Sequence, residues 1–580
     1  MIESSSLLPA IMFEPDGYVL DGPKLMGRQA AGNSFLRAAI NLAEQSAQSG
    51  GKPGLYAYTP YAESAKIFNA LVLRQAPVVK PAWLPADRVD LLASHGSIYV
   101  PGPGIGASAR LRLRVGPAAW SVTGVTHTLC SHNAMDAITD VLAAPVMPWD
   151  ALICTSSVAK QAVSTLFELQ AQYFAWRFGL KSFTTPQLPI IPFGVHAQDF
   201  LFNELEKQTA RLALNVLPDE VVVLFAGRLS FHAKAHPYQM LVGLQAAAER
   251  TGQKVLLLFC GQFPNDAVKD AFLSGASRYA PAVRTQWVNG VTSDAYRQAW
   301  AASEVFVSLS DNLQETFGIT PVEAMASGLP VFVSDWDGYK DTVVDGETGF
   351  RISSWMPPPN LGMALASAFE AGSINYDRYI GLACLEVSVD QKMLIDRLTE
   401  LISSPQKRAM MGAAGRRRVR SVYDWSIVMK QHLSLWASLD ELRQKAILDR
   451  HPAIQNAPTC SPARQDPYRI FGGFPTRLLS GETLVRLVSQ PSLTTDLHHL
   501  LQDKLFIYAK DSLPQSVHLN RLLAKLGQHS QGLPLQEVTQ LLGWPLAQTI
   551  KTSAFLAKLC LVEFSIPSEE CRTRNKNLSS

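Results

Sequence analysis

The 580-residue chain lacks closely spaced cysteines, long apolar runs and a large excess of one charge. Its seven cysteines include no Cys-x-x-Cys pair, which argues against zinc knuckles and a disulfide framework and favours a reducing compartment. The longest apolar runs are strand-length, well below the roughly 20 residues that cross a bilayer. No basic stretch precedes an apolar core near the N-terminus, so no signal peptide is expected. We therefore expect a soluble, cytoplasmic protein.

The composition is that of a globular protein. Hydrophobic residues make up 47% and charged residues 17%, which excludes a disordered or coiled-coil chain. Lys and Arg total 52 against 49 Asp and Glu, a net charge of +3, and this balance argues against bulk binding of nucleic acid. The length allows about four domains, or fewer if they are large α/β domains.

Short β-branched runs alternate with longer helical segments through much of the chain, a pattern typical of βαβ units in a parallel sheet. The clearest stretch runs from Val221 to Ile352, and the first two hundred residues repeat the pattern less cleanly. Two Rossmann-like domains facing each other across a cleft are therefore predicted. The strands expected are Gly54–Tyr58, Ser97–Val100, Ala119–Val125, Ala151–Cys154, Leu188–Pro192, Val221–Ala226, Val255–Cys260, Thr285–Val288, Val305–Ser308 and Val331–Ser334.

Five segments are predicted along the chain. Residues 1–198 and 199–405 form the two Rossmann-like domains, and residues 406–446 are helices that return to the first of them. Residues 447–479 are a linker rich in Pro and Gly, and residues 480–566 form a small, mainly helical, winged-helix-like domain.

The last long helix expected in this small domain, Pro545–Leu559, carries only two lysines, Lys551 and Lys558. A helix that reads DNA needs a more basic surface, so DNA binding is disfavoured. The domain is instead a candidate for a structural role or for docking a protein partner.

Chemically informative residues lie between Ser308 and Gly349. A polar loop carrying Glu315 follows an expected strand, and a helix opens with Thr320 as its N-cap and Pro321 at its first position. Backbone amides at such a helix start favour a phosphate or another anion. A structural alternative exists for Glu323, because Thr320-x-x-Glu323 also has the spacing of a capping box. No packing requirement explains a carboxylate at Glu315.

The spacing Glu315-x7-Glu323, within the sequence ETFGITPVEAMASGLPV, closely resembles the donor-site signature of the family 4 retaining glycosyltransferases, which have the GT-B fold. Phe225-Ala226-Gly227-Arg228-Leu229, followed by Lys234, matches a second family segment. The spacing between Arg228 and Lys234 is about one residue longer than usual, which makes Lys234 the weaker match. The resemblance is strongest over residues 151–436 and absent after about residue 450.

The resemblance implies a retaining, metal-independent hexosyltransferase that uses a nucleotide-diphosphate sugar such as a UDP-, GDP- or ADP-sugar and needs no cofactor. It places the donor on the second domain and a hydroxyl acceptor (a glycan or a lipid-linked sugar) on the first, and a role in surface-polysaccharide synthesis is associated with such enzymes. The implied donor-site residues are Glu323 for the ribose, Glu315 for the transferred sugar, the amides of Phe317, Gly318 and Ile319 for the sugar and diphosphate, and Arg228 and Lys234 for the leaving group.

Weaker matches lie outside the donor signature. His127 follows an expected strand where the family has a cleft histidine close to the transferred sugar, although a lone histidine is often only structural. Arg28 lies where the family has a glycine-rich acceptor loop. Asp424-Trp425 matches the point where the C-terminal helix returns to the first domain. The nearby arginines Arg416, Arg417, Arg418 and Arg420 are expected on a solvated helix face, with peripheral contact to anionic lipid as the alternative.

Two other motifs are set aside. Gly104-x-Gly106-x-x-Ala109 has the spacing of a dinucleotide fingerprint, but Arg110–Val115 alternates as a strand would and no acidic residue follows about twenty positions later, so NAD binding is not expected. Asp335-Trp336-Asp337 has the spacing of a metal-binding Asp-x-Asp. Within the Glu-x7-Glu architecture, Arg, Lys and amides meet the phosphate charge, so no essential metal is expected.

Two other function classes stay open. A GT-B nucleotide-sugar epimerase would use the same donor residues without an acceptor. A non-catalytic scaffold could bind a sugar nucleotide and dock partners through its C-terminal domain, although such a protein is expected to lose the charged donor residues that are present here.

Overall fold

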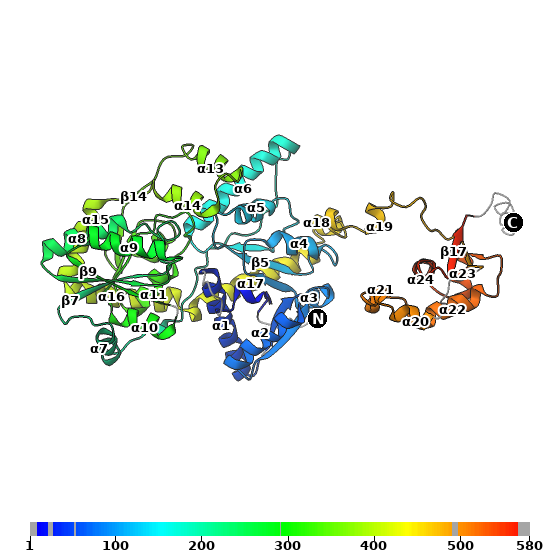
Figure 1. The fold of residues 1–580 in the computed structure, drawn as a ribbon, viewed down its shortest axis with the longest axis horizontal. Helices are drawn as coiled ribbons and strands as arrows, with labels where there is room; N and C mark the ends of the chain where they lie inside the picture. The colour runs from blue at the N-terminus through cyan, green and yellow to red at the C-terminus, as the bar shows by residue number, and fades with distance from the viewer. Residues whose placement is uncertain (1–7, 21–26, 52–53, 291, 490–496, 567–580) are drawn as a thin grey trace. The chain divides into compact units, whose positions relative to one another are not determined.

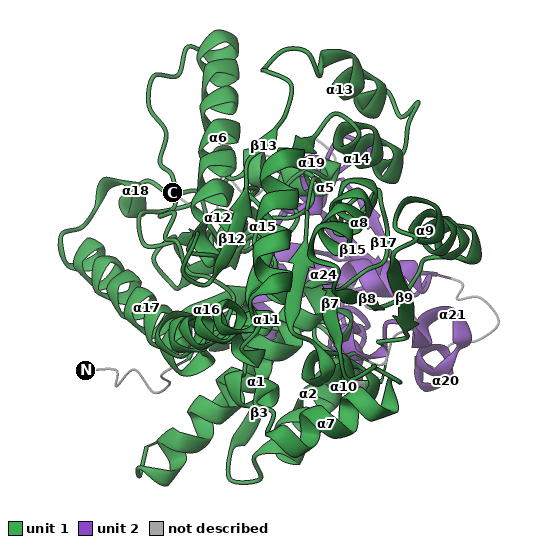
Figure 2. Ribbon diagram, turned by 90° about the vertical axis from the view of Figure 1, so that its left-hand side faces the viewer, with its two compact units in different colours: residues 1–462 green, residues 463–580 purple. Residues whose placement is uncertain are grey.

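The computed structural model describes residues 8–20, 27–51, 54–290, 292–489 and 497–566. The chain divides into two compact units, residues 1–462 and residues 463–580 (Figure 2). The larger unit holds two six-stranded parallel sheets, each lying between layers of helices (Figure 1). The two predicted Rossmann-like domains are thereby confirmed, and their pairing is the GT-B architecture.

The first sheet has the strand order β3-β2-β1-β4-β5-β6, so the direction of the order reverses between β1 and β4. Helices α1 and α2 pack on one face of this sheet, and α4, α5 and α6 pack on the other. The elements are β1 Ala10–Met12, α1 Gly27–Gln48, β2 Gly54–Thr59, α2 Ala62–Gln75, β3 Lys80–Pro85, α3 Val89–His95, β4 Ser97–Val100, α4 Ile105–Arg112, β5 Ser121–Val125, α5 His132–Asp140, β6 Ala151–Ile153 and α6 Ser157–Phe178.

The second sheet repeats this topology with the order β12-β11-β10-β7-β8-β9. Its elements are α7 Glu204–Ala213, β7 Glu220–Ala226, α8 Tyr238–Thr251, β8 Lys254–Cys260, α9 Asp266–Tyr279, β9 Val283–Val288, α10 Ser293–Ala302, β10 Val305–Ser308, α11 Ile319–Ser327, β11 Val331–Ser334, α12 Tyr339–Thr342, β12 Gly349–Ile352 and α15 Gln391–Ser403. Between β12 and α15 an excursion contains β13 Ser354–Trp355, α13 Met363–Glu370, α14 Tyr376–Cys384 and β14 Ser388–Val389.

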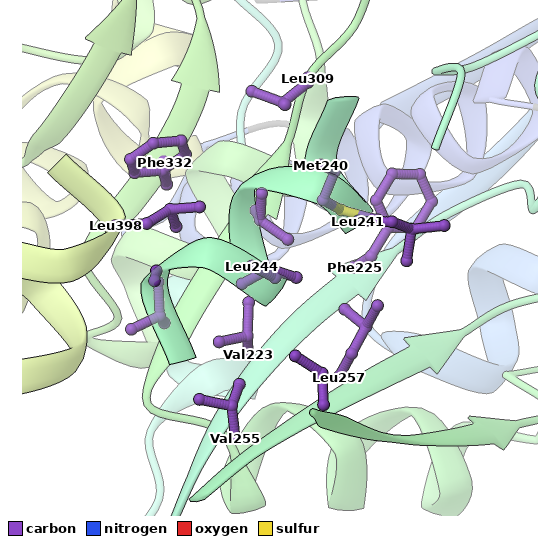
Figure 3. Close-up of a cluster of buried hydrophobic side chains, with 14 of the residues drawn as sticks. Val223, Phe225, Met240, Leu241, Leu244, Val255, Leu257, Leu309, Phe332 and Leu398 are labelled. Atoms are coloured by element: carbon purple, nitrogen blue, oxygen red, sulfur yellow. The ribbon is translucent and has the colours of Figure 1, made fainter. Parts of the chain in front are cut away.

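The apolar run of β7 is buried on both faces, as a central parallel strand requires. Val223 and Phe225 join a core with α8, α9 and α15, and Figure 3 shows its α8 and α15 residues beside them. Val222 and Leu224 join the opposite core with α7, α10 and α11. Because successive side chains point to opposite faces, one continuous hydrophobic run serves both layers.

The C-terminal helices of the larger unit pack against the first domain. Helix α16 (Pro405–Arg418) leads through one π-helical turn (η3, Val419–Tyr423) into α17 (Trp425–Leu448). At the start of α17 the indole Nε1 of Trp425 donates to Ser34 Oγ at 2.7 Å, and α17 packs into the core that contains α1. The two Rossmann-like domains are therefore connected twice.

The smaller unit has its own hydrophobic core beneath a three-stranded antiparallel sheet of order β16-β15-β17. Its elements are α19 Pro467–Ile470, β15 Leu484–Leu487, α20 Leu497–Gln502, α21 Lys504–Ile507, α22 Ser516–Leu526, β16 Leu533–Pro534, α23 Leu535–Leu542, α24 Leu546–Lys558 and β17 Val562–Ser565. The helix predicted over Pro545–Leu559 is present as α24, and β15, which was not predicted, is the central strand. The segment predicted as a linker contains short helices, α18 (Pro452–Gln455) before the boundary and α19 after it.

The prediction of a strand over Arg110–Val115 is wrong, because helix α4 opens at Ile105 directly after the Gly104 turn. The two arginines within this helix are both paired with acids. Arg112 is fully buried, and its guanidinium donates to both carboxylate oxygens of Asp150 at 2.7 Å. Arg110 pairs with Asp140. One of the two reasons for setting NAD aside is therefore removed, while the missing acidic residue remains.

Two further predictions need correction. Leu188–Pro192 is not a strand and contributes only an isolated parallel bridge from Ile190 to Cys154, since Pro189 and Pro192 interrupt the ladder. Arg416 and Arg418 do not lie on a purely solvated helix face. Arg416 donates to the carbonyl of Ser327 at the end of α11, and Arg418 donates to the last carbonyls of α12. Within the described residues, no helix is long and apolar enough to cross a bilayer.

Candidate functional site

The predicted donor residues gather at the carboxyl ends of β7, β10 and β11. Arg228 and Lys234 follow β7, Glu315 lies in the loop between β10 and α11, and Tyr339 follows β11. Neighbouring parallel strands end at one edge of their sheet, so loops separated by about one hundred residues meet there.

An ion pair between Lys234 and Glu315 is at the centre of the site. The Lys234 ammonium donates to the Glu315 carboxylate and, at 3.3 Å, to Tyr339 Oη, which also lies 2.9 Å from Ser308 Oγ. Lys234 is only 8% exposed. Burial disfavours its charged form, but Glu315 and Tyr339 outweigh that cost and raise the pKa of Lys234. Burial also opposes ionisation of Glu315, yet Lys234 and Arg228 keep its pKa below the ordinary value.

The loop carrying the two cations is tied to the loop carrying Glu315. Four side chains of residues 310–314 form hydrogen bonds with the backbone of residues 232–236. The distance between the two cations and the Glu315 carboxylate is therefore fixed before any ligand binds. Ser310 Oγ donates to the carbonyl of Lys234 at 3.3 Å, and the amide of His236 donates to Asp311 Oδ2 at 3.2 Å. Asn312 Nδ2 donates to the carbonyl of His232, and Gln314 Nε2 donates to the carbonyl of Ala233 at 3.1 Å.

Arg228 lies at the edge of this cluster. Its guanidinium donates to the carbonyl of Ala233 at 3.1 Å, and its charge helps to lower the pKa of Glu315. Lys234, the weaker match in the sequence, is thus the more deeply buried of the two cations. The extra residue in the loop does not move its ammonium away from Glu315.

Glu323 lies one helical turn inside α11 and is bonded to a residue that the sequence did not indicate. Tyr296 Oη donates to Glu323 Oε2 at 2.7 Å. Burial raises the pKa of Glu323 to about 7, partly offset by the Tyr296 bond and the Lys234 charge. The expected cap at Thr320 is wrong, because α11 begins at Ile319 with Gly318 at its N-cap and no side-chain cap. The capping-box explanation of Glu323 is therefore not supported.

At the start of α11 the backbone, and not a side chain, faces the site. Gly318 has φ of 73°, and a Cβ built there would lie 2.1 Å from Tyr339 Cε1, so only glycine fits. The Gly318 amide donates to Glu315. The buried hydroxyl of Thr320 has no hydrogen-bond partner in the structure. Phe317 is itself buried, so it would contribute to ligand binding through its backbone.

His127 approaches the donor loop from the first domain through an aromatic chain. Its ring stacks on Phe193 with centroids 5.3 Å apart, and Phe193 meets Phe317 edge-on at 5.6 Å. Burial, with a smaller effect of the Arg28 charge, lowers the pKa of His127 to about 4. The imidazole is therefore neutral near pH 7. Arg28 is exposed and pairs with Asp16 at 2.6 Å.

Direct hydrogen bonds join the two Rossmann-like domains beside the site. Ser156 Oγ, at the N-cap of α6, donates to the carbonyl of Thr316 at 2.7 Å. The hydroxyl of Ser157 donates to Asp341 at 2.7 Å. The loop that carries Glu315 is thus held from both domains.

Asp337 is a second carboxyl group that sequence reasoning did not place in the site. It is 8% exposed, and one of its oxygens accepts from the Tyr339 amide at 3.1 Å while the other has no partner. Burial, followed by the charge of Glu315, raises its pKa well above the ordinary value. Among the described residues, no group of three or more His, Cys, Asp or Glu is arranged to hold a metal ion.

The central part of the chain is similar to known proteins. Residues 206–357 match the family described as Glycosyl transferases group 1. The chain is 26% identical over 219 residues to alpha-maltose-1-phosphate synthase of Mycolicibacterium smegmatis, covering 37% of this chain and 47% of that protein. It is also 26% identical over 221 residues to spore coat protein SA of Bacillus subtilis, covering 37% and 48%.

The chain thus spans about half the length of these curated relatives. Among solved structures, Anabaena HepE in complex with UDP aligns with a TM-score of 0.49 and 14% identity, over 74% of this chain and 100% of that chain.

Proposed function

Since residues 206–357 match the family described as Glycosyl transferases group 1, we propose that the protein is a retaining glycosyltransferase that moves a hexose from a nucleotide-diphosphate sugar to a hydroxyl acceptor without a metal. The observation that supports it best is the meeting of Arg228, Lys234 and Glu315 at the uncapped start of α11. Cations and helix amides together suit a diphosphate, and the carboxylate suits the hydroxyls of a sugar.

The cations stabilise the leaving group in this proposal. As the bond from the sugar C1 to the phosphate oxygen breaks, negative charge accumulates on the diphosphate, and preorganised Lys234 and Arg228 meet it there. The diphosphate competes with Glu315 for the Lys234 ammonium. Glu315 then accepts hydrogen bonds from the hydroxyls of the transferred sugar.

The remaining groups orient the two substrates. Glu323 accepts from the ribose hydroxyls, and the neutral imidazole of His127 approaches the sugar from the first domain. The acceptor oxygen bonds C1 on the face that the diphosphate leaves, and a phosphate oxygen takes the acceptor's proton. Asp337 is unsuited as a nucleophile, because burial favours its protonated form.

A substitution of Glu315 tests the proposal. Glu315→Gln keeps the shape of the side chain but removes the charge that holds sugar hydroxyls. Transfer, measured as acceptor-dependent release of nucleoside diphosphate, should fall at least about tenfold, or about 1.4 kcal/mol of transition-state stabilisation. The control is Glu347→Gln, an exposed carboxylate in the same domain. Wild-type turnover in Glu315→Gln would show that Glu315 has another role.

Two additional arms of the same assay test the remaining parts of the proposal. Treatment with a chelator should leave transfer unchanged, and loss of activity restored by manganese would refute metal independence. Release of nucleoside diphosphate should require the acceptor. Sugar-nucleotide turnover without any acceptor would instead favour an epimerase.

A further inference from the structure

The C-terminal end of α6 projects from the larger unit. Figure 1 shows α6 extending beyond the neighbouring α5, and the view in Figure 2 agrees. Every residue from 175 to 182 is exposed, over the last turn of the helix and the coil after it. In these residues the helix contacts solvent on all sides, whereas Val163 and Phe167 earlier in α6 are buried against the domain.

The projecting end is apolar where most exposed helix ends are polar. Leu169, Tyr173 and Trp176 are 56%, 50% and 77% exposed, and their i, i+4, i+7 spacing places them on one helical face. Phe178 and Leu180 extend the exposed apolar surface past the helix. Single exposed apolar residues are normal, but a contiguous group marks an interaction site.

The aromatic side chains of this end form one continuous cluster. Tyr173 packs against Phe174 and Trp176 with ring centroids 6.0 and 5.7 Å apart. Phe174 in turn packs against Phe178 and Phe183, at 5.8 Å in both cases. We call residues 169–183 the α6 tip. Its aromatic rings lie on both sides of the helix, so a rigid, flat protein surface would cover only part of them.

The charge of the α6 tip has one sign. Residues 169–190 contain no Asp or Glu, whereas Arg177 and Lys181 are both exposed. The Arg177 guanidinium lies 5.4 Å from the centroid of the Phe178 ring, so cation and aromatic surface are presented together. Glu168 directly precedes the tip, and Asp136 and Asp140 of α5 line a pocket with Gln170 at its start, where Asp140 is paired with Arg110.

We propose that the α6 tip docks the protein on an anionic lipid surface. Tyr and Trp side chains suit the boundary between headgroups and acyl chains, because each has an apolar ring and a polar atom. A fluid interface can surround rings on both sides of a helix. Arg177 and Lys181 complement the negative surface potential of anionic lipids. The tip itself contributes no carboxylate that would repel such a surface.

Docking at the tip also limits the distance between the donor site and the lipid surface. The N-cap of α6, Ser156, bonds the loop that carries Glu315. The 22 residues of α6 span about 33 Å at about 1.5 Å per residue. The docked tip therefore holds that loop within about 33 Å of the headgroups.

Vesicle sedimentation with the full chain tests the proposal. The protein is mixed with vesicles of phosphatidylcholine alone, or with added phosphatidylglycerol, at low salt and at about 1 M salt, where charge is screened beyond about 3 Å. The variants are Tyr173→Ser/Trp176→Ser and Arg177→Glu/Lys181→Glu. The control is Trp355→Ser, a tryptophan that is 66% exposed on β13 in the second domain. Circular dichroism and thermal unfolding establish that each variant is folded.

Wild type and Trp355→Ser should bind the anionic vesicles at least about tenfold more strongly than the neutral ones at low salt. Both double variants should lose at least about tenfold of that binding. Failure of the wild type to bind, or wild-type binding by Tyr173→Ser/Trp176→Ser, would overturn the proposal. A third result would also overturn it: the wild type fails to bind vesicles, and light scattering detects a wild-type dimer that Tyr173→Ser/Trp176→Ser abolishes. The tip would then contact a second copy of the chain.

Discussion

Glu323 and Tyr296 share a hydrogen bond in the interior of the second domain, and that bond affects when Glu323 carries its charge. Burial raises the pKa of Glu323 to about 7, while the Tyr296 hydroxyl favours the ionised form. Ribose hydroxyls donate stronger hydrogen bonds to a carboxylate than to a carboxylic acid, since hydrogen bonds to a charged group are the stronger ones. The ionisation of this one residue therefore couples pH to donor binding.

Donor affinity should rise with pH. If only ionised Glu323 binds the ribose, affinity should increase about tenfold between about pH 6 and 8, as the ionised fraction of a group with a pKa near 7 increases. Calorimetric titration of the donor sugar nucleotide over this range measures the effect. Glu323→Gln should abolish the dependence, and Tyr296→Phe should shift it to higher pH. An unchanged pH profile in Glu323→Gln would assign the dependence to another group.

The same shift has the opposite sign for folding stability. Because the folded state raises the pKa of Glu323 from 4.5 to about 7, the folded protein binds this proton more tightly than the unfolded chain does. The contribution of Glu323 to stability is therefore greatest below about pH 4.5 and is lost as the pH rises through 7. Donor binding and stability respond to this proton in opposite directions.

Residues close together in sequence were the predictable part of the site. Glu315 and Glu323 flank one helix start, and Arg228 and Lys234 share one loop, so a local pattern indicated all four. Tyr296 lies on α10 and Tyr339 begins α12, and their contacts depend on how these elements pack around the sheet. Asp337 was considered only as part of an Asp-x-Asp motif. Its burial beside Glu315 follows from packing that no local pattern reports.

At the scale of elements, strands buried on both faces were predicted accurately, whereas β1 and β3 were missed. The ranges Val305–Ser308 and Val331–Ser334 agree with β10 and β11, which are continuous β-branched runs. Strand β1 has only three residues, and β3 contains Lys80 and two prolines at the edge of its sheet. Proline is tolerated at an edge, so β3 gives no strand signal in the sequence. Helix α4 was missed because its arginines alternate as in a strand, and the buried pairing of Arg112 with Asp150, which places an arginine inside the fold, leaves no local sequence signal.

The arginines of α16 allow a test at this scale. Arg418 donates to the carbonyls of Asp341 and Thr342 at 2.7 and 2.9 Å, which end the helix beside the donor site. Arg418→Ala should lower the free energy of unfolding by about 1–3 kcal/mol, since bonds to a charged donor are lost. Denaturant unfolding measures it. The control Arg417→Ala removes an exposed arginine one residue earlier and should change stability by less than about 0.5 kcal/mol. Equal destabilisation by the two substitutions would show that Arg418 does not cap α12.

At the scale of the whole molecule, the two compact units have separate hydrophobic cores. Leu257 belongs to a core of the second Rossmann-like domain, and Leu522 belongs to the core of the smaller unit. Both are fully buried. Separate cores allow separate cooperative transitions.

Calorimetry should resolve these transitions. Leu522→Ala should cost about 2–5 kcal/mol and lower only the transition of the smaller unit, whereas Leu257→Ala should lower only that of the larger unit. The two variants serve as controls for each other. A single transition that both substitutions shift equally would show that the units unfold together.

The central claim is that the basic loop, Glu315 and the start of α11 bind a nucleotide-diphosphate sugar. The most direct measurement is the thermal unfolding of the full chain with UDP-, GDP- and ADP-sugars in turn. At least one should raise the unfolding temperature of the wild type, and Arg228→Ala, which removes a cation at the edge of the site, should reduce that rise. Failure of every sugar nucleotide to stabilise the wild type, or an undiminished rise in Arg228→Ala, would contradict the claim.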